Sequence, residues 1–438
     1  MLQICLCISI IFCTFVTSIR DEDLRSGQRT KIPRAESKIG VRKAKMVKVE
    51  KMIKMFYIHI PFCKSRCVYC DFYSTTSLAL SQRYVDALCK EMESRGRSAE
   101  GRLLPEGRKK EHGAGGKRIE TVYLGGGTPS QLSGEQLRQI FSHLLNMYAL
   151  APDAEVTIEC NPDDVTEEFA LLLSELPVNR VSMGAQTFSQ ERLRFLRRRH
   201  TAEQVPEAVE RLRKAGIENI SVDLMYGFPG ETMEEWERDI QSAIKLNVEH
   251  LSAYALQYEE GTPLYKMLER GEVTEVDEEV SRQMYYRLID ALAEAGFEHY
   301  EISNWGKPGR HSRHNSNYWN QTPYIGLGAA AHSFDGENRQ WNVADIRQYM
   351  EGIEKGEPCV EHEELTPDNH YNEIVMTALR TSEGLSLEKL SKAYADYCLR
   401  QAKRFIDDGL LTMENQHLRL TRKGLFVSDM VMAELMKV

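Results

Sequence analysis

Residues 57–72 read YIHIPFCKSRCVYCDF and hold three cysteines, Cys63, Cys67 and Cys70, in a C-x3-C-x2-C arrangement. The run before the first cysteine is apolar, so we expect a buried strand over residues 56–60 that leads into a cysteine loop. Only 10 of the 438 residues are cysteine, so a chance occurrence of this spacing is rare. The cluster therefore calls for a chemical explanation.

Three thiolates on one loop can hold three irons of a [4Fe–4S] cluster and leave the fourth iron open to a substrate or cofactor. The alternative is zinc, which needs a fourth ligand to close a tetrahedral site. His59 is the nearest candidate, but a strand residue four positions before Cys63 fits that role poorly. We expect a packed, hydrogen-bonded histidine there, and the pattern favours the cluster.

The chain around this loop alternates between short apolar runs and amphipathic stretches with helical periodicity. We expect strands at 56–60, 121–124, 156–159, 180–183, 220–224 and 250–255, and helices at 83–93, 135–147, 166–175, 202–215 and 233–245. Six strand–helix units in a row predict an α/β fold with a parallel sheet covered by helices, open or closed into a partial barrel. Residues 95–118 lack periodicity and are predicted to be an exposed insertion.

The remaining chain divides into three parts. We expect a core over 55–290, a connecting region over 291–365, and a C-terminal domain over 366–438, with one long helix at 278–295. In the last of these, predicted helices at 386–397 and 398–408 and a hairpin near 410–420 are typical of a small winged-helix-like module.

Composition limits the class of protein. A hydrophobic content of 42% excludes a mostly disordered chain. A net charge of −9 argues against a nucleic-acid partner, and a mean hydropathy of −0.44 argues against a polytopic membrane protein. Residues 2–19 are apolar and residues 20–54 are rich in lysine and arginine.

The apolar run suggests a signal peptide or a membrane anchor, but no basic residue precedes it. Export would also expose the cysteine cluster to an oxidising compartment. We therefore interpret residues 1–54 as a disordered or mis-assigned start, with translation beginning at Met52 or Met55, and expect a cytoplasmic protein.

The cysteine loop and its flanks resemble the radical S-adenosylmethionine (SAM) superfamily. Within it, the chain from Phe56 onward is similar to the branch that contains oxygen-independent coproporphyrinogen III dehydrogenases and HemW-type heme chaperones. The resemblance implies a partial (β/α)6 TIM-like barrel, a cluster on Cys63, Cys67 and Cys70, and SAM chelated by the open iron.

Two further segments match SAM-binding positions. Residues 125–130 read GGGTPS, and glycines there let backbone N–H groups approach a charged ligand. A glycine triplet alone is usually a turn, but its place one unit after the cysteine loop matches the family's SAM motif at Gly126, Gly127 and Thr128. Glu159 ends the third expected strand, on the edge where barrel ligands lie.

The resemblance also implies ligand contacts at positions whose local sequence is ambiguous. Gln186, Arg198 and Asp223 match residues of the SAM site, and in the dehydrogenase branch these attend a second SAM molecule. Arg198 lies in a basic run that is ordinarily a solvated surface. Tyr57 and Tyr69 match ligand positions too, with core packing as the alternative.

A heme site is suggested by residues 312–319, SRHNSNYW, in which one histidine lies beside two large aromatic residues. Imidazole is a common axial ligand of heme iron, although a loop histidine is more often a hydrogen-bonded surface residue. The string His-Asn-x-x-Tyr-Trp matches the motif associated with heme in HemW-type proteins, which makes His314 the candidate ligand. Residues 324–334, YIGLGAAAHSF, add a small-residue segment where backbone could approach a flat ligand.

Two functions follow from the resemblance. The first is a heme chaperone that carries a [4Fe–4S] cluster and SAM and passes heme to acceptor proteins, through which it could associate with membranes. The second is an oxygen-independent coproporphyrinogen III dehydrogenase, a radical oxidoreductase acting on a porphyrin precursor. Dehydrogenase relatives carry a fourth cysteine where this chain has Phe72, so we predict the chaperone and leave open whether the protein is an enzyme.

Overall fold

The computed structural model describes residues 53–96 and 118–437. The predictions for residues 1–52 and for most of the insertion at 95–118 lie outside these residues. Among the described helices, none is long and apolar enough to cross a membrane.

The centre of the fold is a sheet of six parallel strands in sequence order, as predicted. They are β1 (Met55–Ile60), β2 (Ile119–Gly126), β3 (Leu150–Cys160), β4 (Arg180–Gln186), β5 (Asn219–Tyr226) and β6 (His250–Ala255). Each pairs in parallel with the next, so their carboxyl ends meet at one edge.

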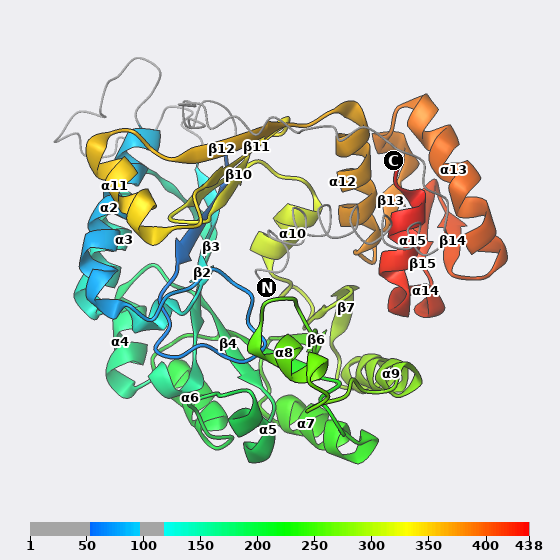
Figure 1. Cartoon of the computed structure of the whole chain (residues 1–438), viewed down its shortest axis with the longest axis horizontal. Coiled ribbons are helices and arrows are strands. Elements are labelled where there is room, and N and C mark those ends of the chain that lie inside the picture. Colours follow the sequence, from blue (N-terminus) through cyan, green and yellow to red (C-terminus); the bar gives the residue numbers. More distant parts are fainter. Residues whose placement is uncertain (1–52, 97–117, 438) are drawn as a thin grey trace.

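Helices cover the outer face of this sheet (Figure 1). They are α2 (Ser81–Gly96), α3 (Gly134–Met147), α4 (Glu167–Glu175), α5 (Gln190–Phe195), α6 (Gln204–Lys214), α7 (Met233–Lys245) and α9 (Glu278–Glu294), with α8 (Pro263–Glu269) in the loop after β6. The order of strands and helices confirms the predicted α/β class, with a parallel sheet covered by helices.

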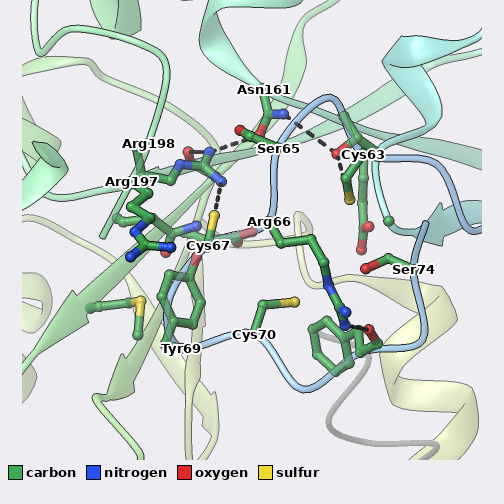
Figure 2. A pocket seen from close by; sticks show the side chains of 18 of the residues that line it. Cys63, Ser65, Arg66, Cys67, Tyr69, Cys70, Ser74, Asn161, Arg197 and Arg198 are labelled. Atoms are coloured by element: carbon green, nitrogen blue, oxygen red, sulfur yellow. Dashed lines mark hydrogen bonds between the residues drawn. The ribbon is translucent and has the colours of Figure 1, made fainter. Parts of the chain in front are cut away.

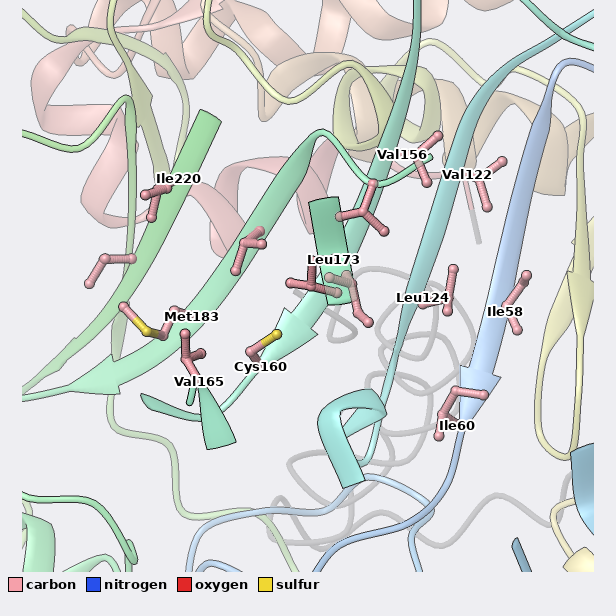
Figure 3. Packing of buried hydrophobic residues seen from close by; sticks show 14 of the residues in the cluster. Ile58, Ile60, Val122, Leu124, Val156, Cys160, Val165, Leu173, Met183 and Ile220 are labelled. Atoms are coloured by element: carbon pink, nitrogen blue, oxygen red, sulfur yellow. The ribbon is translucent and has the colours of Figure 1, made fainter. Parts of the chain in front are cut away.

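The two faces of the sheet differ in chemistry. Ile58, Leu124 and Val156 point outward and pack in the apolar core against the helices (Figure 3). Because side chains alternate along a strand, the residues between them face inward. Arg180 and Asp223 belong to this inner face, which is rich in polar groups. The polar candidate site residues therefore lie on the inner face, and apolar packing on the outer face stabilises the fold.

Residues 298–364 extend both ends of the sheet. On one side β8 (Asn304–Gly306) pairs with β6 and with β7 (Glu298–Glu301). On the other side β9 (Tyr324–Leu327) pairs in parallel with β1, followed outward by β10 (His332–Phe334), β11 (Asn338–Asn342) and β12 (Val360–Glu364). The same region contributes α10 (Arg313–Trp319) and α11 (Ile346–Lys355). The predicted connecting region is thus part of the sheet, and the domain limits remain a prediction.

The C-terminal elements form a second, α-rich unit with its own apolar core, on the far side of α10 from the helices α2 and α3 (Figure 1). They are α12 (Pro367–Leu379), β13 (Leu385–Ser386), α13 (Lys392–Asp407), β14 (Leu411–Glu414), β15 (His417–Leu420), α14 (Arg422–Phe426) and α15 (Ser428–Leu435). The predicted hairpin is present. The two helices predicted at 386–397 and 398–408 are wrong, because one helix spans 392–407 and the residues before it pair with β15.

Candidate functional site

The three cysteines of the loop after β1 line one cavity at the carboxyl edge of the strands (Figure 2). The first turn of the loop is fixed by two backbone hydrogen bonds, from Cys63 N to Thr75 O (2.9 Å) and from Thr75 N to Pro61 O (2.7 Å). The loop's centre is held by Val68 N, which donates to Leu196 O. These backbone hydrogen bonds therefore fix the conformation of the loop that carries the three cysteines.

The donor set fits an iron–sulfur cluster better than a single ion. Among the described residues, no three His, Cys, Asp or Glu side chains converge on one metal position. A four-iron cluster does not require such convergence, because each thiolate binds a different iron. Burial raises the pKa of the Cys63 thiol, and it raises the pKa of the Cys70 thiol to about 12. Cationic metal must therefore stabilise the thiolates that bind it.

His59 is packed and hydrogen-bonded, as expected. Its Nδ1 lies 2.9 Å from the hydroxyl of Tyr57, and its Nε2 lies 3.1 Å from Tyr73 O. The side chain is 1% exposed.

The glycine segment after β2 lies directly against the cysteine loop. Gly127 N donates to Ile60 O at 2.9 Å, and a Cβ on Gly127 would lie 2.8 Å from Phe62 O. Gly126 has φ +117°, a conformation that favours glycine. This close approach brings the Thr128 hydroxyl to 3.6 Å from Cys63 Sγ.

Glu159 ends β3 on the cavity wall and is already engaged by its neighbours. Its Oε1 accepts from the Tyr123 hydroxyl (2.7 Å) and its Oε2 accepts from Gly126 N (3.1 Å). Burial raises the pKa of this carboxyl. Glu159 thus couples the glycine segment to the barrel interior as well as facing the cavity.

Arg198 connects the cysteine loop to the strand ends. Its Nη2 donates to Asn161 Oδ1 (2.7 Å) and to Gly184 O (2.5 Å), and its Nη1 lies 3.7 Å from Cys67 Sγ (Figure 2). A cation beside a thiolate stabilises it, so this contact suits a metal-binding cysteine. Arg198 is therefore not part of a solvated basic surface.

The other predicted residues fall into two groups. Tyr69, Gln186 and Asp223 line the cavity. Gln186 has φ +66°, an unusual conformation for a residue other than glycine. Burial raises the pKa of Asp223.

Tyr57 and His314 are not among the residues that line the cavity. Tyr57 is 4% exposed and stacks on Tyr123. His314 is 1% exposed in α10; its Nδ1 lies 3.0 Å from Thr121 Oγ1 and its Nε2 lies 3.3 Å from the Tyr318 hydroxyl. Heme ligation by His314 would require these contacts to break, and that role stays a prediction.

Sequence reasoning did not single out three residues that shape the cavity. Asn161 Oδ1 and Gly184 O accept hydrogen bonds from the guanidinium of Arg198. The Ser182 hydroxyl donates to the Asp223 carboxylate. Asn161 directly follows β3 and Gly184 lies in the carboxyl half of β4, on the same edge as the predicted residues, and that position is the signal that could have found these two. Ser182 lies earlier in β4 and has no such signal.

Comparison with known proteins places this site in a family. Residues 57–243 match the model of the radical SAM superfamily, and residues 365–427 match that of the HemN C-terminal domain. The HemN structure from Escherichia coli, described as coproporphyrinogen III oxidase and a radical SAM enzyme, shares the fold with a TM-score of 0.73. It is 21% identical in sequence and covers 88% of this chain and 90% of its own.

Curated relatives match over nearly their whole length. The "Heme chaperone HemW" of Lactococcus lactis is 33% identical over 84% of this chain and 93% of its own. Those of Mycobacterium tuberculosis and Bacillus subtilis are each 35% identical, covering 87% and 78% of this chain and 94% and 87% of their own. A bovine protein, "Radical S-adenosyl methionine domain-containing protein 1, mitochondrial", is 28% identical over 87% of this chain and 86% of its own. The chain therefore belongs to the HemW family within the radical SAM superfamily.

Proposed function

We propose that this chain is a heme chaperone, which binds heme and passes it to acceptor proteins while carrying a [4Fe–4S] cluster and SAM. The observation that carries this proposal is the match to curated heme chaperones at 33–35% identity over nearly their whole length. Phe72 supports it, because it stands on the cavity wall where dehydrogenase relatives carry a further cysteine.

The cavity residues suggest how the two cofactors are held. We assign three irons to Cys63, Cys67 and Cys70. We assign SAM to the surrounding wall, which comprises Tyr69, Gly126, Gly127, Thr128, Glu159, Gln186, Arg198 and Asp223. When bound, the cluster supplies an iron without a protein ligand, to which SAM can attach.

The protein's own groups prepare that wall for a charged ligand. The carboxyls of Glu159 and Asp223 are acceptors for the ammonium and hydroxyl groups of SAM, and the glycine segment offers backbone N–H groups close to them. Arg198 orients Asn161 and faces Cys67. The likeness to HemN, at 21% identity, supports a shared fold and does not support a decarboxylation activity.

The test is anaerobic reconstitution of the purified protein with iron and sulfide, followed by three measurements. Iron and acid-labile sulfide report the cluster, a heme titration reports binding, and product analysis reports coproporphyrinogen turnover. We expect a cluster, stoichiometric heme uptake, transfer of that heme to an apo-form heme protein, and no vinyl product. Sustained decarboxylation would replace the proposal with the dehydrogenase function.

Matched cysteine variants make the cluster assignment specific. Cys67→Ala should abolish the brown absorption and most of the bound iron, because a three-thiolate site loses one of its ligands. Cys359→Ala removes an exposed cysteine far along the chain and should leave both unchanged. Equal iron in the two variants would contradict the assignment.

A further inference from the structure

Hydrogen-bonded side chains on the cavity wall join two of the three cysteines (Figure 2). At one end the Thr128 hydroxyl lies 3.6 Å from Cys63 Sγ, and at the other end Arg198 Nη1 lies 3.7 Å from Cys67 Sγ. Asn161 lies between them: its Nδ2 donates to Thr128 Oγ1 at 3.5 Å, and its Oδ1 accepts from Arg198 Nη2 at 2.7 Å. These three wall residues, which we call the hydrogen-bond bridge, therefore form a continuous link between the two sulfurs.

The donors and acceptors of the hydrogen-bond bridge are arranged as two thiolates require. A thiolate only accepts hydrogen bonds, so beside a metal-bound Cys63 the Thr128 hydroxyl must donate to the sulfur. The hydroxyl oxygen then accepts from the amide of Asn161, and the amide oxygen accepts from the guanidinium. Arg198 has only donors, so it begins the bridge and also donates directly to Cys67 Sγ. Linked hydrogen bonds of this kind polarise and strengthen one another.

The positive charge of Arg198 makes no ion pair with a carboxylate among the described residues. The neighbouring Arg199, by contrast, pairs with Asp163 at 2.9 Å and with Asp164 at 2.8 Å. The Arg198 guanidinium instead contacts two neutral oxygens and Cys67 Sγ, and its Nε is buried without a hydrogen-bond partner. Burying a cation is costly unless negative charge lies close to it, and a metal-bound Cys67 thiolate supplies that charge.

Two strand ends hold the bridge in place. Gly184 lies in β4, and a Cβ there would lie 3.2 Å from Arg198 Nη2, so glycine lets the guanidinium lie close to the strand. Asn161 directly follows β3 and precedes Pro162, and its φ of −88° and ψ of 148° are the extended conformation favoured before proline. The backbone therefore fixes the amide and the guanidinium relative to each other.

Hydrogen bonds and positive charge near cluster sulfurs change the reduction potential of a cluster. The reduced form holds one more electron than the oxidised form, so donors and cations beside its sulfurs stabilise the reduced form and raise the potential. The hydrogen-bond bridge brings a hydroxyl to Cys63 and a guanidinium to Cys67. Its effect would therefore act through two of the three cysteine ligands.

We propose that the hydrogen-bond bridge orients the Cys63 and Cys67 thiolates and raises the reduction potential of the cluster, with Asn161 as the positioning residue at its centre. This inference rests on the cluster assignment within the proposed function. It gives Thr128 and Arg198 a role besides contact with SAM, and Asn161 acts through these two neighbours.

The experiment measures the midpoint potential of the cluster in the full chain after anaerobic reconstitution, by redox titration monitored by electron paramagnetic resonance. SAM is omitted, so that a lost contact with SAM cannot account for a shift. The variants are Arg198→Met, Asn161→Leu, Thr128→Val, which removes the hydroxyl at similar volume, and Thr128→Ser, which keeps it. Thr377→Val is the matched control, because this buried threonine donates to Glu373 O in the C-terminal unit. Iron and acid-labile sulfide are measured on every sample.

We expect the potential to fall in Arg198→Met, Asn161→Leu and Thr128→Val, and to stay near the wild-type value in Thr128→Ser and Thr377→Val. At the wild-type midpoint, the ratio of reduced to oxidised cluster in Arg198→Met should fall about tenfold or more, and tenfold corresponds to about 59 mV for a one-electron couple. A merely structural role would lower the cluster content without shifting the potential of the clusters that remain.

If Arg198→Met or Asn161→Leu loses its cluster, the two Thr128 variants decide between the alternatives. Equal potentials in Thr128→Val and Thr128→Ser, at equal iron content, overturn this inference alone. A wild-type protein that takes up no iron and sulfide overturns the cluster assignment itself.

Discussion

Replacement of Gly127 by alanine tests whether backbone contact between the glycine segment and the cysteine loop supports the site. The added Cβ would lie 2.8 Å from Phe62 O, 2.9 Å from Phe62 N and 2.9 Å from Pro61 C. These are backbone atoms and cannot rotate away. Gly127 does not have positive φ, so alanine brings no conformational strain of its own.

The magnitude follows from two opposing effects. Overpacking of this kind costs about 1–3 kcal/mol. Alanine also lowers the conformational entropy of the unfolded chain, which stabilises the folded state by about 0.4–1 kcal/mol. We therefore expect a net loss of about 1–2 kcal/mol, which corresponds to a fall in the apparent melting temperature of roughly 2–8 °C. Because Phe62 precedes Cys63, the shift should also reduce iron uptake.

The assay is thermal unfolding monitored by circular dichroism, with iron content measured on the same reconstituted sample. Gly134→Ala is the matched control, because there the added Cβ meets only the side-chain ends of Arg138 and Leu172. It should stay within about 1 kcal/mol of wild type. A Gly127→Ala protein that melts no lower than wild type and binds as much iron would refute the reasoning.

Three further predictions concern buried charges, each measured by thermal unfolding. Arg180→Met should raise the melting temperature, because within the described chain its buried guanidinium has no hydrogen-bond partner and burying such a charge is costly. A lower melting temperature would show that the charge is compensated by a neighbour such as Asp223. Burial raises the pKa of Glu231 to about 7, so the folded state binds the extra proton below that pH. The contribution of this group to the free energy of unfolding is therefore fully present at pH 4.5 and falls by roughly 3 kcal/mol as the pH rises through 7. The melting temperature should fall less with pH in Glu231→Gln than in the wild-type protein, and an equal dependence on pH in both proteins contradicts this. Glu91→Ala should cost about 3–5 kcal/mol, because it removes a buried carboxylate that Arg95, the Gly328 N–H and the Tyr349 hydroxyl share. Glu354→Ala, at an exposed ion pair, should cost much less, and similar losses in the two variants would show that burial does not set the difference.

Local patterns in the sequence predicted the elements that define the barrel. The alternation in runs such as 56–60 and 220–224 follows directly from one apolar and one polar face of a strand. The parallel order then places the carboxyl ends of the strands together, which is why Glu159, Gln186 and Asp223 line one cavity with the cysteines. The ligand roles of these residues remain predictions.

Non-local contacts account for what sequence reasoning did not find. Arg198 reaches Asn161 and Cys67 only because β3, β4 and the cysteine loop converge at one edge. His314 was predicted as a ligand from its motif, but its burial depends on how α10 packs on β2. In the C-terminal unit, pairing of Ser386 with His417 draws the first residue of a predicted helix into a strand.

The pairing of β1 with β9 affects how the chain can fold during synthesis. One edge of β1 has no neighbour until the ribosome has produced the chain as far as Leu327. Over that interval the backbone hydrogen-bonding groups on this edge of β1 are unpaired, and the loop that follows carries three thiols. Such an open apolar strand can pair with the same strand of another nascent molecule. Insertion of the cluster would then be safest once β9 has closed this edge.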